Sequence, residues 1–383
     1  MSVTPVPYVP APRTSAPAAA ERGALRHAAP ALLGFLAVRL LGLAVLARWA
    51  HLKGHGLWPL LARSWDSLWY LDIAGHGYAD GPSYPRDLAF FPLFPGLVRA
   101  LSAVLPGSRA SIALGIAVVG SLVAAWGVFA VGDRLRGRRT GTVLAVLWGA
   151  SPVAAVQWMG YTESLFTAFA AWALYAVLAG RWAWAAGLAV AAGLTRPTGL
   201  AVAAAVCAAG LLAAARGERR ALAAALTAPL GWLGYVGWVA LVRGRWDGYF
   251  EVQRRWGNAW DGGAETLREL RRYLVHSPAP SFFLAVVSGV LLVSAGLYAC
   301  CLADRQPAPL LVFTGVLLLV VLGSDGVWFP RARFLLPGFP LLLPLAVGIA
   351  RARRHVAALV LAGAALSSAW LGGHMLLVWG GAP

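Results

Sequence analysis

Long apolar stretches separated by short polar turns dominate this chain. Many of the stretches have the length, roughly 17–25 residues, that an α-helix needs to cross a bilayer. The alternating strands of about ten residues that build a membrane β-barrel are absent from the pattern. We therefore predict an all-α polytopic membrane protein with about 11 transmembrane helices. The apolar segments fall roughly at residues 30–50, 110–132, 140–158, 162–179, 182–195, 198–215, 220–242, 281–302, 309–323, 334–350 and 356–379.

A shorter apolar run, residues 88–105, interrupts this series. It contains Pro92 and Pro95 and is followed closely by Pro106. Proline removes a helix hydrogen bond and disfavours a clean span. We therefore predict that this run is interfacial or re-entrant and does not cross the membrane. A crossing segment would invert the orientation of everything that follows it.

The arginine-rich loops predict how the chain is oriented. Loops rich in Lys and Arg face the cytoplasm, and here they occupy every second gap between apolar segments. This pattern predicts a plasma-membrane protein with its N-terminus in the cytoplasm and its C-terminus outside. The basic loops are "RLRGRR" (134–139), Arg181, "RGERR" (216–220), "DR" (304–305) and "RARRH" (351–355). The outer face then holds the loop 51–109, "GYTES" (160–164), "TRPTG" (195–199), the loop 243–280 and "SDGVWFPRARF" (324–334).

Composition supports the membrane assignment, and the distribution of the arginines explains the high net charge. Hydrophobic residues make up 60% of the chain and charged residues 12%, whereas a soluble domain is nearer half apolar and a quarter charged. The formal net charge is +17, but the arginines stand in short clusters between apolar runs, so we expect no nucleic-acid partner. The three cysteines lie inside apolar runs without the spacing of a zinc site or a disulfide framework, and we interpret them as buried structural thiols.

The N-terminal residues 1–29 differ from the rest of the chain. They are rich in proline and alanine with little periodicity, and we predict a disordered cytoplasmic tail. The apolar run from about Pro30 to Ala50 is too long for the apolar core of a signal peptide, so we interpret it as the first transmembrane helix. Residues 30–383 are predicted to form one transmembrane domain.

The most unusual stretch on the outer face is "SWDSLWYLDIAGHGY", residues 64–78. One interpretation is an amphipathic helix on the membrane surface with solvated acids. The other is a catalytic carboxylate, because aromatic neighbours raise the pKa of a general base and can stack on a sugar ring. In a helix, two stripes would lie side by side: Asp66 with Tyr70, and Trp65 with Trp69, Asp72 and His76. We prefer Asp66 to Asp72 as the catalytic residue, and interpret Asp80 and Asp87 as solvated loop acids.

Other charged residues on the outer face are candidates for substrate binding. Glu163 stands at the start of an apolar helix, where it either complements the helix dipole or acts in a site. Arg196 lies between two apolar helices, where a charge needs a partner or reaches toward the interface. Arg331 and Arg333 lie at the start of a predicted helix, on a loop that we assign to the outer face. The preference of basic residues for cytoplasmic loops therefore does not explain them. A pair of guanidinium groups suits a phosphate group.

These motifs together resemble a known family. "WDSLWYLDIAGHGY" followed by "AFFPLFPG" is similar to the first lumenal loop of the PIG-V-type mannosyltransferases, which add the second mannose to GPI anchors in eukaryotes. "SPVAAVQWMGYTESLF", "TRPTGL" and "PRARFLLPGFP" resemble later signatures of that family in the same order, from about Trp65 to Pro340. The resemblance implies a GT-C fold with juxtamembrane helices in the first outer loop, 51–109. It also implies an essential acid in that loop.

The resemblance further implies the reaction. Such enzymes take a sugar from a polyprenyl phosphate at the non-cytoplasmic face, and the resemblance implies a site that needs no metal and no cofactor. Asp66 and Asp72 could instead bind a divalent cation, but no ligand spacing supports it. We therefore expect transfer of mannose from polyprenyl-phosphate-mannose to a hydroxyl of a lipid-linked or cell-surface glycan. Asp66 would be the general base of one inverting displacement, and Arg331 and Arg333, with Arg196 behind them, would stabilise the leaving phosphate.

The composition sets a limit on the acceptor. The chain is rich in alanine and arginine, as actinobacterial proteins are, and such bacteria make no GPI anchors. "TRPTGL" also has Pro-Thr where eukaryotic members more often have Ser-Asn, so the GPI acceptor is not carried over. A transporter or flippase of a lipid-linked sugar is the alternative, because intramembrane charges suit it too. Neither an internal repeat nor a midplane cluster of motifs favours it. A non-catalytic membrane scaffold would not require these motifs to converge.

Overall fold

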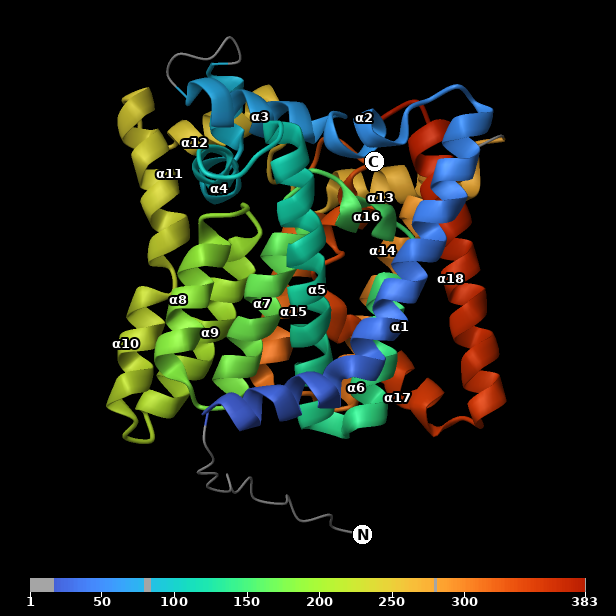
Figure 1. Ribbon diagram of the computed structural model, residues 1–383. Helices are drawn as coiled ribbons and strands as arrows, with labels where there is room; N and C mark the ends of the chain where they lie inside the picture. Colours follow the sequence, from blue (N-terminus) through green and yellow to red (C-terminus); the bar gives the residue numbers. More distant parts are fainter. Residues whose placement is uncertain (1–16, 79–83, 279–280, 383) are drawn as a thin grey trace.

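The computed structural model describes residues 17–78, 84–278 and 281–382 (Figure 1). Within these ranges the regular secondary structure is helical, apart from an isolated bridge between Trp260 and Ser324. The prediction of an all-α protein is therefore confirmed. The α-helices are α1 (Pro17–Leu52), α2 (Leu57–Ala62), α3 (Asp66–His76), α4 (Leu93–Ser102), α5 (Arg109–Arg136), α6 (Arg138–Gly149), α7 (Glu163–Leu178), α8 (Trp182–Gly193), α9 (Gly199–Ala214), α10 (Arg219–Thr227), α11 (Leu230–Arg243), α12 (Gly248–Arg255), α13 (Ala264–Arg271), α14 (Phe282–Ala303), α15 (Ala308–Gly323), α16 (Arg331–Phe334), α17 (Leu343–Arg351) and α18 (Arg354–Leu377). Short 3₁₀ turns η1 (Arg86–Ala89), η2 (Ala154–Trp158) and η4 (Phe339–Leu342), and a π-helical turn η3 (Arg272–His276), join them.

Several helices are suited to a bilayer. In the described ranges, five are long and apolar enough to cross it: Gly23–Leu52, Arg109–Arg136, Arg219–Arg243, Phe282–Ala303 and Arg354–Leu377. Shorter apolar helices, among them α7, α8, α9 and α15, run beside them. The chain is thus a multi-pass membrane protein, while the number of 11 crossings stays a prediction.

The first helix starts earlier than expected. α1 begins at Pro17, so the prediction of disorder is wrong for residues 17–29, and residues 1–16 lie outside the described ranges. The early part of α1 lies along the lower end of the bundle in Figure 1. There the Arg138 guanidinium donates to the carbonyl oxygen of His27 at 3.0 Å. A contact with the α5–α6 junction therefore fixes a segment whose sequence shows little periodicity.

The run 88–105 forms α4, only 10 residues long. At 1.5 Å per residue it covers about 15 Å, half of the hydrocarbon thickness, which agrees with the prediction that it does not cross. Its buried Phe94 and Val98 pack with Tyr70 and Ala74 of α3 and with Ala113 of α5. α4 therefore supports the helix that carries the "WDSLWY" motif.

The predicted span 140–158 is interrupted, so a single helix there is wrong. α6 ends at Gly149, and the chain continues through turns and η2 before α7 begins. Unwound backbone inside a bundle needs hydrogen-bond donors, because lipid supplies none. Side chains provide them at four carbonyl oxygens: Arg39 to Ala154, Ser368 to Ser151, Gln157 to Trp148 and Ser164 to Gln157.

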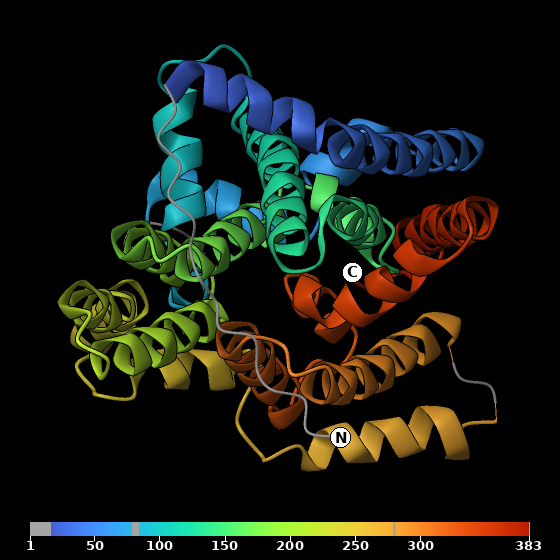
Figure 2. The same ribbon diagram turned by 90° about the horizontal axis from the view of Figure 1, so that it is seen from below.

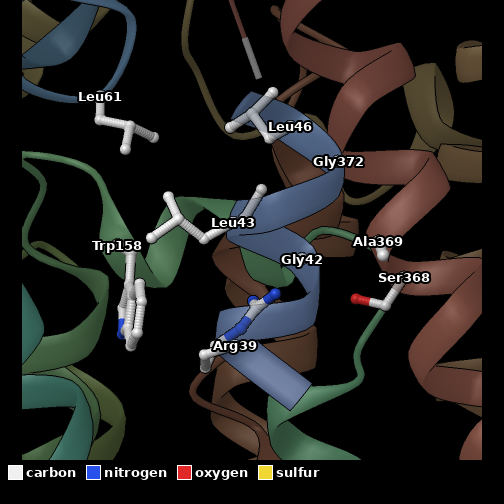
Figure 3. A pocket seen from close by; sticks show the side chains of 10 residues that line it. Arg39, Gly42, Leu43, Leu46, Leu61, Trp158, Ser368, Ala369 and Gly372 are labelled. Carbon is white, nitrogen blue, oxygen red and sulfur yellow. The ribbon is translucent and has the colours of Figure 1, made fainter. Parts of the chain in front are cut away.

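Arg39 is the charged member of this set and lies in the middle of α1. Figure 3 shows it at a small pocket between α1 and α18, beside Leu43 and across from Ser368. The side chain is buried, and its Nε has no hydrogen-bond partner among the described residues. A buried charge in a membrane helix is costly without compensation. Here the carbonyl oxygen of Ala154, which lies beyond the C-terminal end of α6, accepts a hydrogen bond from the Arg39 guanidinium.

The two ends of the bundle carry different sequences. α2, α3, α12, α13 and α16 lie at or near the upper end in Figure 1, and the predicted cytoplasmic loops lie at the lower end. At that lower end the Arg139 guanidinium donates to the carbonyl oxygen of Ala352 at 2.8 Å, which joins two of the basic loops. Viewed along the bundle in Figure 2, α1 and α13 lie at opposite edges. The motifs that sequence assigns to one face thus meet at one end.

Candidate functional site

Four charged side chains from four distant segments converge at the upper end of the bundle. Asp66 and Glu163 are the first residues of α3 and α7. A carboxylate in the first turn of a helix is favoured by the helix dipole. Arg196 stands in the turn between α8 and α9, and Arg333 lies in the short helix α16. The structure therefore brings together four of the predicted site residues.

The four side chains form one chain of ion pairs. Nη2 of Arg333 contacts Oδ2 of Asp66, and Nε of Arg333 lies 3.8 Å from Oε1 of Glu163. Nη1 of Arg196 lies 2.7 Å from the same Glu163 oxygen. Only Asp66 reaches solvent appreciably, with 26% of its side chain exposed against 2% for Glu163 and 5% for Arg333. Two acids and two arginines leave no net charge, which is the condition for burying such a network.

A shell of aromatic and hydroxyl groups holds this network. Arg196 Nη1 donates to Thr162 Oγ1 at 3.0 Å, and the Tyr70 hydroxyl lies 3.2 Å from the same oxygen. Burial raises the pKa of Tyr70, so its hydroxyl remains a neutral hydrogen-bonding group. The Arg333 guanidinium stacks over the rings of Tyr161 and Phe334, at 5.0 and 5.3 Å from their centroids. Thr162, Tyr161 and Phe334 were not predicted, although Thr162 directly precedes Glu163, Phe334 directly follows Arg333, and Tyr161 lies two residues before Glu163.

The backbone before α3 is strained where it presents Asp66. Trp65 has φ 48° and ψ −116°, a conformation that a bulky residue rarely adopts. Such outliers collect at functional sites, where the surrounding structure enforces them. Trp65 itself is partly buried against the main core. Its backbone conformation therefore sets the direction of Asp66, while its contact with a substrate stays a prediction.

Trp69 belongs to an aromatic cluster beside the network. Its ring stacks on Phe90 with centroids 5.5 Å apart, and it makes a T-shaped contact with Trp256, with centroids 4.9 Å apart. Trp256 directly follows α12, in the predicted outer loop 243–280, and was not predicted as a site residue. Phe90 also meets the ring of Tyr70 edge to face. The cluster connects the loop 51–109 to a segment far along the chain.

Asp72 and His76 lie further along α3 and do not join the ion-pair network. Asp72 Oδ1 pairs with His76 Nδ1 at 2.9 Å, and the His76 side chain is 60% exposed. The second carboxylate oxygen of Asp72 is buried without a hydrogen-bond partner among the described residues. The pair occupies the stripe predicted for it, but the structure gives it no contact with Asp66.

Arg331 also lies apart from the network. Its Nη1 donates to Thr266 Oγ1 at 2.5 Å, and its guanidinium covers the ring of Trp328. Residues two apart on a helix point in nearly opposite directions, so Arg331 faces α13 while Arg333 faces Asp66. The predicted clamp of two arginines on one phosphate is therefore not formed in this structure.

Two further expectations concern acids and metals. Asp87 is fully buried in η1, so its interpretation as a solvated loop acid is wrong, and Asp80 lies outside the described residues. In the described parts of the chain, no three His, Cys, Asp or Glu side chains come together as a metal site requires. No set of metal ligands is assigned.

Comparisons with known proteins give a family and a fold. Residues 50–215 match the sequence model of the family described as mannosyltransferase (PIG-V). This range contains Asp66, Glu163 and Arg196, and the resemblance stated from the sequence is confirmed. No curated protein sequence matches the chain.

Solved structures add the architecture. The archaeal oligosaccharyltransferase AglB from Archaeoglobus fulgidus, in complex with an inhibitory peptide and a dolichol-phosphate, is similar with a TM-score of 0.50 and 14% identity. The match covers 91% of this chain and 56% of that one. A structure of the Archaeoglobus fulgidus oligosaccharyltransferase with Zn and sulfate has a TM-score of 0.48 and 13% identity, over 90% of this chain and 53% of that one. The chain thus spans little more than half the length of these enzymes.

The class follows from these findings. At 14% identity the likeness to AglB concerns the fold alone, and it agrees with the predicted GT-C architecture. The chain is thus a multi-pass membrane protein with a fold similar to that of AglB, and part of it is similar to a mannosyltransferase family. The mannosyltransferase family is the one to which residues 50–215 are similar.

Proposed function

We propose that this protein transfers a hexose, mannose in the first place, from a polyprenyl-phosphate sugar to a hydroxyl of a lipid-linked or surface glycan. The reaction would take place at the extracytoplasmic face of the plasma membrane. One observation carries the proposal: the partly exposed Asp66 heads a buried network of charges that is built from four segments of one end of the bundle. An acid that can reach substrate and arginines that can hold phosphate thus lie within one site.

The residues have distinct roles in the proposed reaction. Asp66 takes the proton of the acceptor hydroxyl while that oxygen attacks the anomeric carbon. The bond from this carbon to the phosphate oxygen breaks, and polyprenyl phosphate leaves with the bonding electron pair. Arg333 stabilises the charge that develops on the phosphate, and Arg196 supports it through Glu163. Attack from the side opposite to the leaving group inverts the anomeric configuration.

The aromatic cluster and the polar end of α3 suit the acceptor. The face of an indole ring can carry a sugar, and Trp69 with Trp256 presents such rings beside Asp66. Asp72 and His76 offer hydrogen-bonding groups for sugar hydroxyls at the exposed end of the same helix. Arg331 is assigned here to positioning α13, since Thr266 already binds it.

The test is transfer of radiolabelled mannose from polyprenyl-phosphate-mannose in membranes. General-base assistance contributes about 10²–10⁴-fold, so Asp66→Asn should lower transfer by that factor at matched expression. The control is Asp247→Asn, which removes a carboxylate that is paired with arginine on a different loop. It should transfer at the wild-type rate. Equal transfer by wild type and Asp66→Asn would remove Asp66 from the chemistry.

A further inference from the structure

The Arg333 guanidinium has more donors than it uses. Nη2 contacts Asp66, but Nη1 and Nε are buried and have no hydrogen-bond partner among the described residues. The 3.8 Å between Nε and Glu163 Oε1 is an ion-pair distance and too long for a hydrogen bond. Guanidinium offers five N–H groups in a planar fork, a geometry that matches two oxygens of a phosphate. Arg333 is thus incompletely satisfied at a buried position.

Its two acidic neighbours differ in how firmly they are held. Glu163 is 2% exposed and lies 2.7 Å from Arg196, so it cannot move without breaking a second buried pair. Asp66 is 26% exposed and has Arg333 as its one ion-pair partner in the described chain. Rotation of its side chain toward solvent would break one contact only. Glu163 is therefore the fixed counterion of Arg333, and Asp66 is the replaceable one.

From this asymmetry we propose that Arg333 is the binding site for the phosphate of the polyprenyl donor, and that Asp66 occupies it until the phosphate displaces it. The proposal rests on the proposed function and deepens it. A phosphodiester carries one negative charge, as a carboxylate does, so the exchange keeps the buried network neutral. Asp66 would then be free to meet the acceptor hydroxyl only in the donor complex.

The exchange also favours the reaction itself. When the bond to the sugar breaks, the phosphodiester becomes a monoester that carries about −1.5 to −2 charges near pH 7. Arg333 then holds a larger charge than it held in the ground state, and stronger binding in the transition state is what accelerates a reaction. Glu163 and Arg196 keep the guanidinium in place during this change, as positioning residues.

Binding of a phosphate probe separates this mechanism from a simple binding role of Asp66. The measurement is calorimetric titration of the purified full chain with farnesyl phosphate, a short isoprenyl monophosphate, with farnesol as the probe without phosphate. Because Asp66 competes for Arg333, Asp66→Asn should bind farnesyl phosphate about five- to tenfold more tightly than wild type, the worth of one partly exposed ion pair. Arg333→Gln should bind it at least about tenfold more weakly.

The control is again Asp247→Asn, which also removes one negative charge from an aspartate–arginine pair. It should leave the affinity unchanged, and an equal gain there would overturn the proposal as a general charge effect. Equal or weaker binding by Asp66→Asn would overturn it too. If thermal unfolding shows that Asp66→Asn does not fold, Asp66→Ser removes the same charge and replaces it in the comparison.

The outcomes also separate this inference from the proposed function. Tighter binding by Asp66→Asn without mannose transfer by wild type would support the exchange and reject mannose as the sugar. Transfer by wild type without tighter binding by Asp66→Asn would support the transferase and reject the exchange. Absence of farnesyl phosphate binding in all variants, with farnesol bound equally, would reject a phosphate site at Arg333 altogether.

Discussion

Glu163 is the residue on which the charge network depends. It contacts both arginines and is 2% exposed. Removing one partner of a buried ion pair leaves an uncompensated charge and costs about 3–5 kcal/mol. We therefore expect Glu163→Gln to lower the free energy of unfolding by about that amount, as measured by thermal or chemical unfolding in detergent.

A surface pair provides the control for Glu163. Glu265 pairs with Arg268, whose side chain is 70% exposed. Exposed pairs contribute about 0–1 kcal/mol, so Glu265→Gln should scarcely change the unfolding curve. Similar decreases in the free energy of unfolding of the two variants would mean that the Glu163 network stabilises the fold no more than a surface ion pair does.

Asp87 predicts a dependence of stability on pH. Burial raises its pKa to about 6, above the value near 3.9 of an unfolded aspartate. The folded chain therefore holds the proton more tightly, and its stability falls as pH rises from about 4 through about 6. Asp87→Asn mimics the protonated acid and should unfold at a higher temperature than wild type at pH 8. The difference should shrink toward pH 4.

The pKa of Asp247 is shifted in the opposite direction, so this residue serves as the control for Asp87. Hydrogen bonds from Arg245 and Arg254 lower its pKa to about 2. Its ionised form is the one that suits the folded chain, so Asp247→Asn should gain no stability at pH 8. A gain of equal size in both variants would show that general charge repulsion, and not burial of Asp87, sets the effect.

At the residue scale the sequence predicted which side chains lie close together better than it predicted how they pair. Asp66, Glu163, Arg196 and Arg333 converge because motifs on one side of a bundle must meet at one end. The partner of Asp66 could not be predicted, because Arg333 is far along the chain and only packing selects it over Arg331. The Arg-Ala-Arg spacing was the available signal, since it places the two arginines on opposite sides of a helix.

At the scale of elements, the interrupted segment between α6 and α7 carries the clearest stability prediction. The Ser368 hydroxyl of α18 donates to the carbonyl oxygen of Ser151 at 2.8 Å. A buried acceptor without its donor costs about 1–3 kcal/mol, and Ser368→Ala should lower stability by that amount. Thr142→Ala is the control, because its exposed hydroxyl bonds the carbonyl of Arg138 within the same helix. Equal effects would mean that this segment is satisfied in another way.

The helix order was predictable, and the interruption was not. Apolar length locates the long apolar helices, since lipid imposes one rule on all of them, but it does not locate short helices such as α12 and α13. The break after Gly149 follows from Ser151 and Pro152, because proline disfavours helix in itself and in the residue before it. Mean hydropathy over a long window is little changed by two residues such as Ser151 and Pro152. The apolar run 140–158 was therefore predicted to be one span. The early start of α1 at Pro17 was missed for a related reason, since contacts with α5 and α6 and not periodicity fix it.

At the scale of the whole molecule, charge pairing removes an objection to the predicted orientation. The loop 243–280 has seven arginines, which is unusual for an outer loop. Six of them pair with acids of the same loop: Arg243 and Arg255 with Glu251, Arg245 and Arg254 with Asp247, Arg268 with Glu265, and Arg272 with Glu269. The loop is therefore far less basic than its arginine count indicates.

The orientation itself can be tested with cysteine labelling. In a background without Cys207, Cys300 and Cys301, we expect Trp246→Cys to react with a membrane-impermeant maleimide on intact cells. Trp246 is 88% exposed and lies on the predicted outer face. Arg353→Cys, in a predicted inner loop, should react only after the cells are opened. The reverse pattern would invert the topology and place the Asp66 network at the cytoplasmic face.

The interruption after α6 also bears on biogenesis. α6 has 12 residues, too few to be stably threaded through a bilayer alone, since a span needs about 20. Two of the four donors that satisfy the backbone of this region come from helices far from it along the chain, Arg39 from α1 and Ser368 from α18. Ser368 follows Ser151 by 217 residues. The carbonyl oxygen of Ser151 therefore receives its donor only after α18 has been synthesised, so the interrupted segment is completed late in biogenesis.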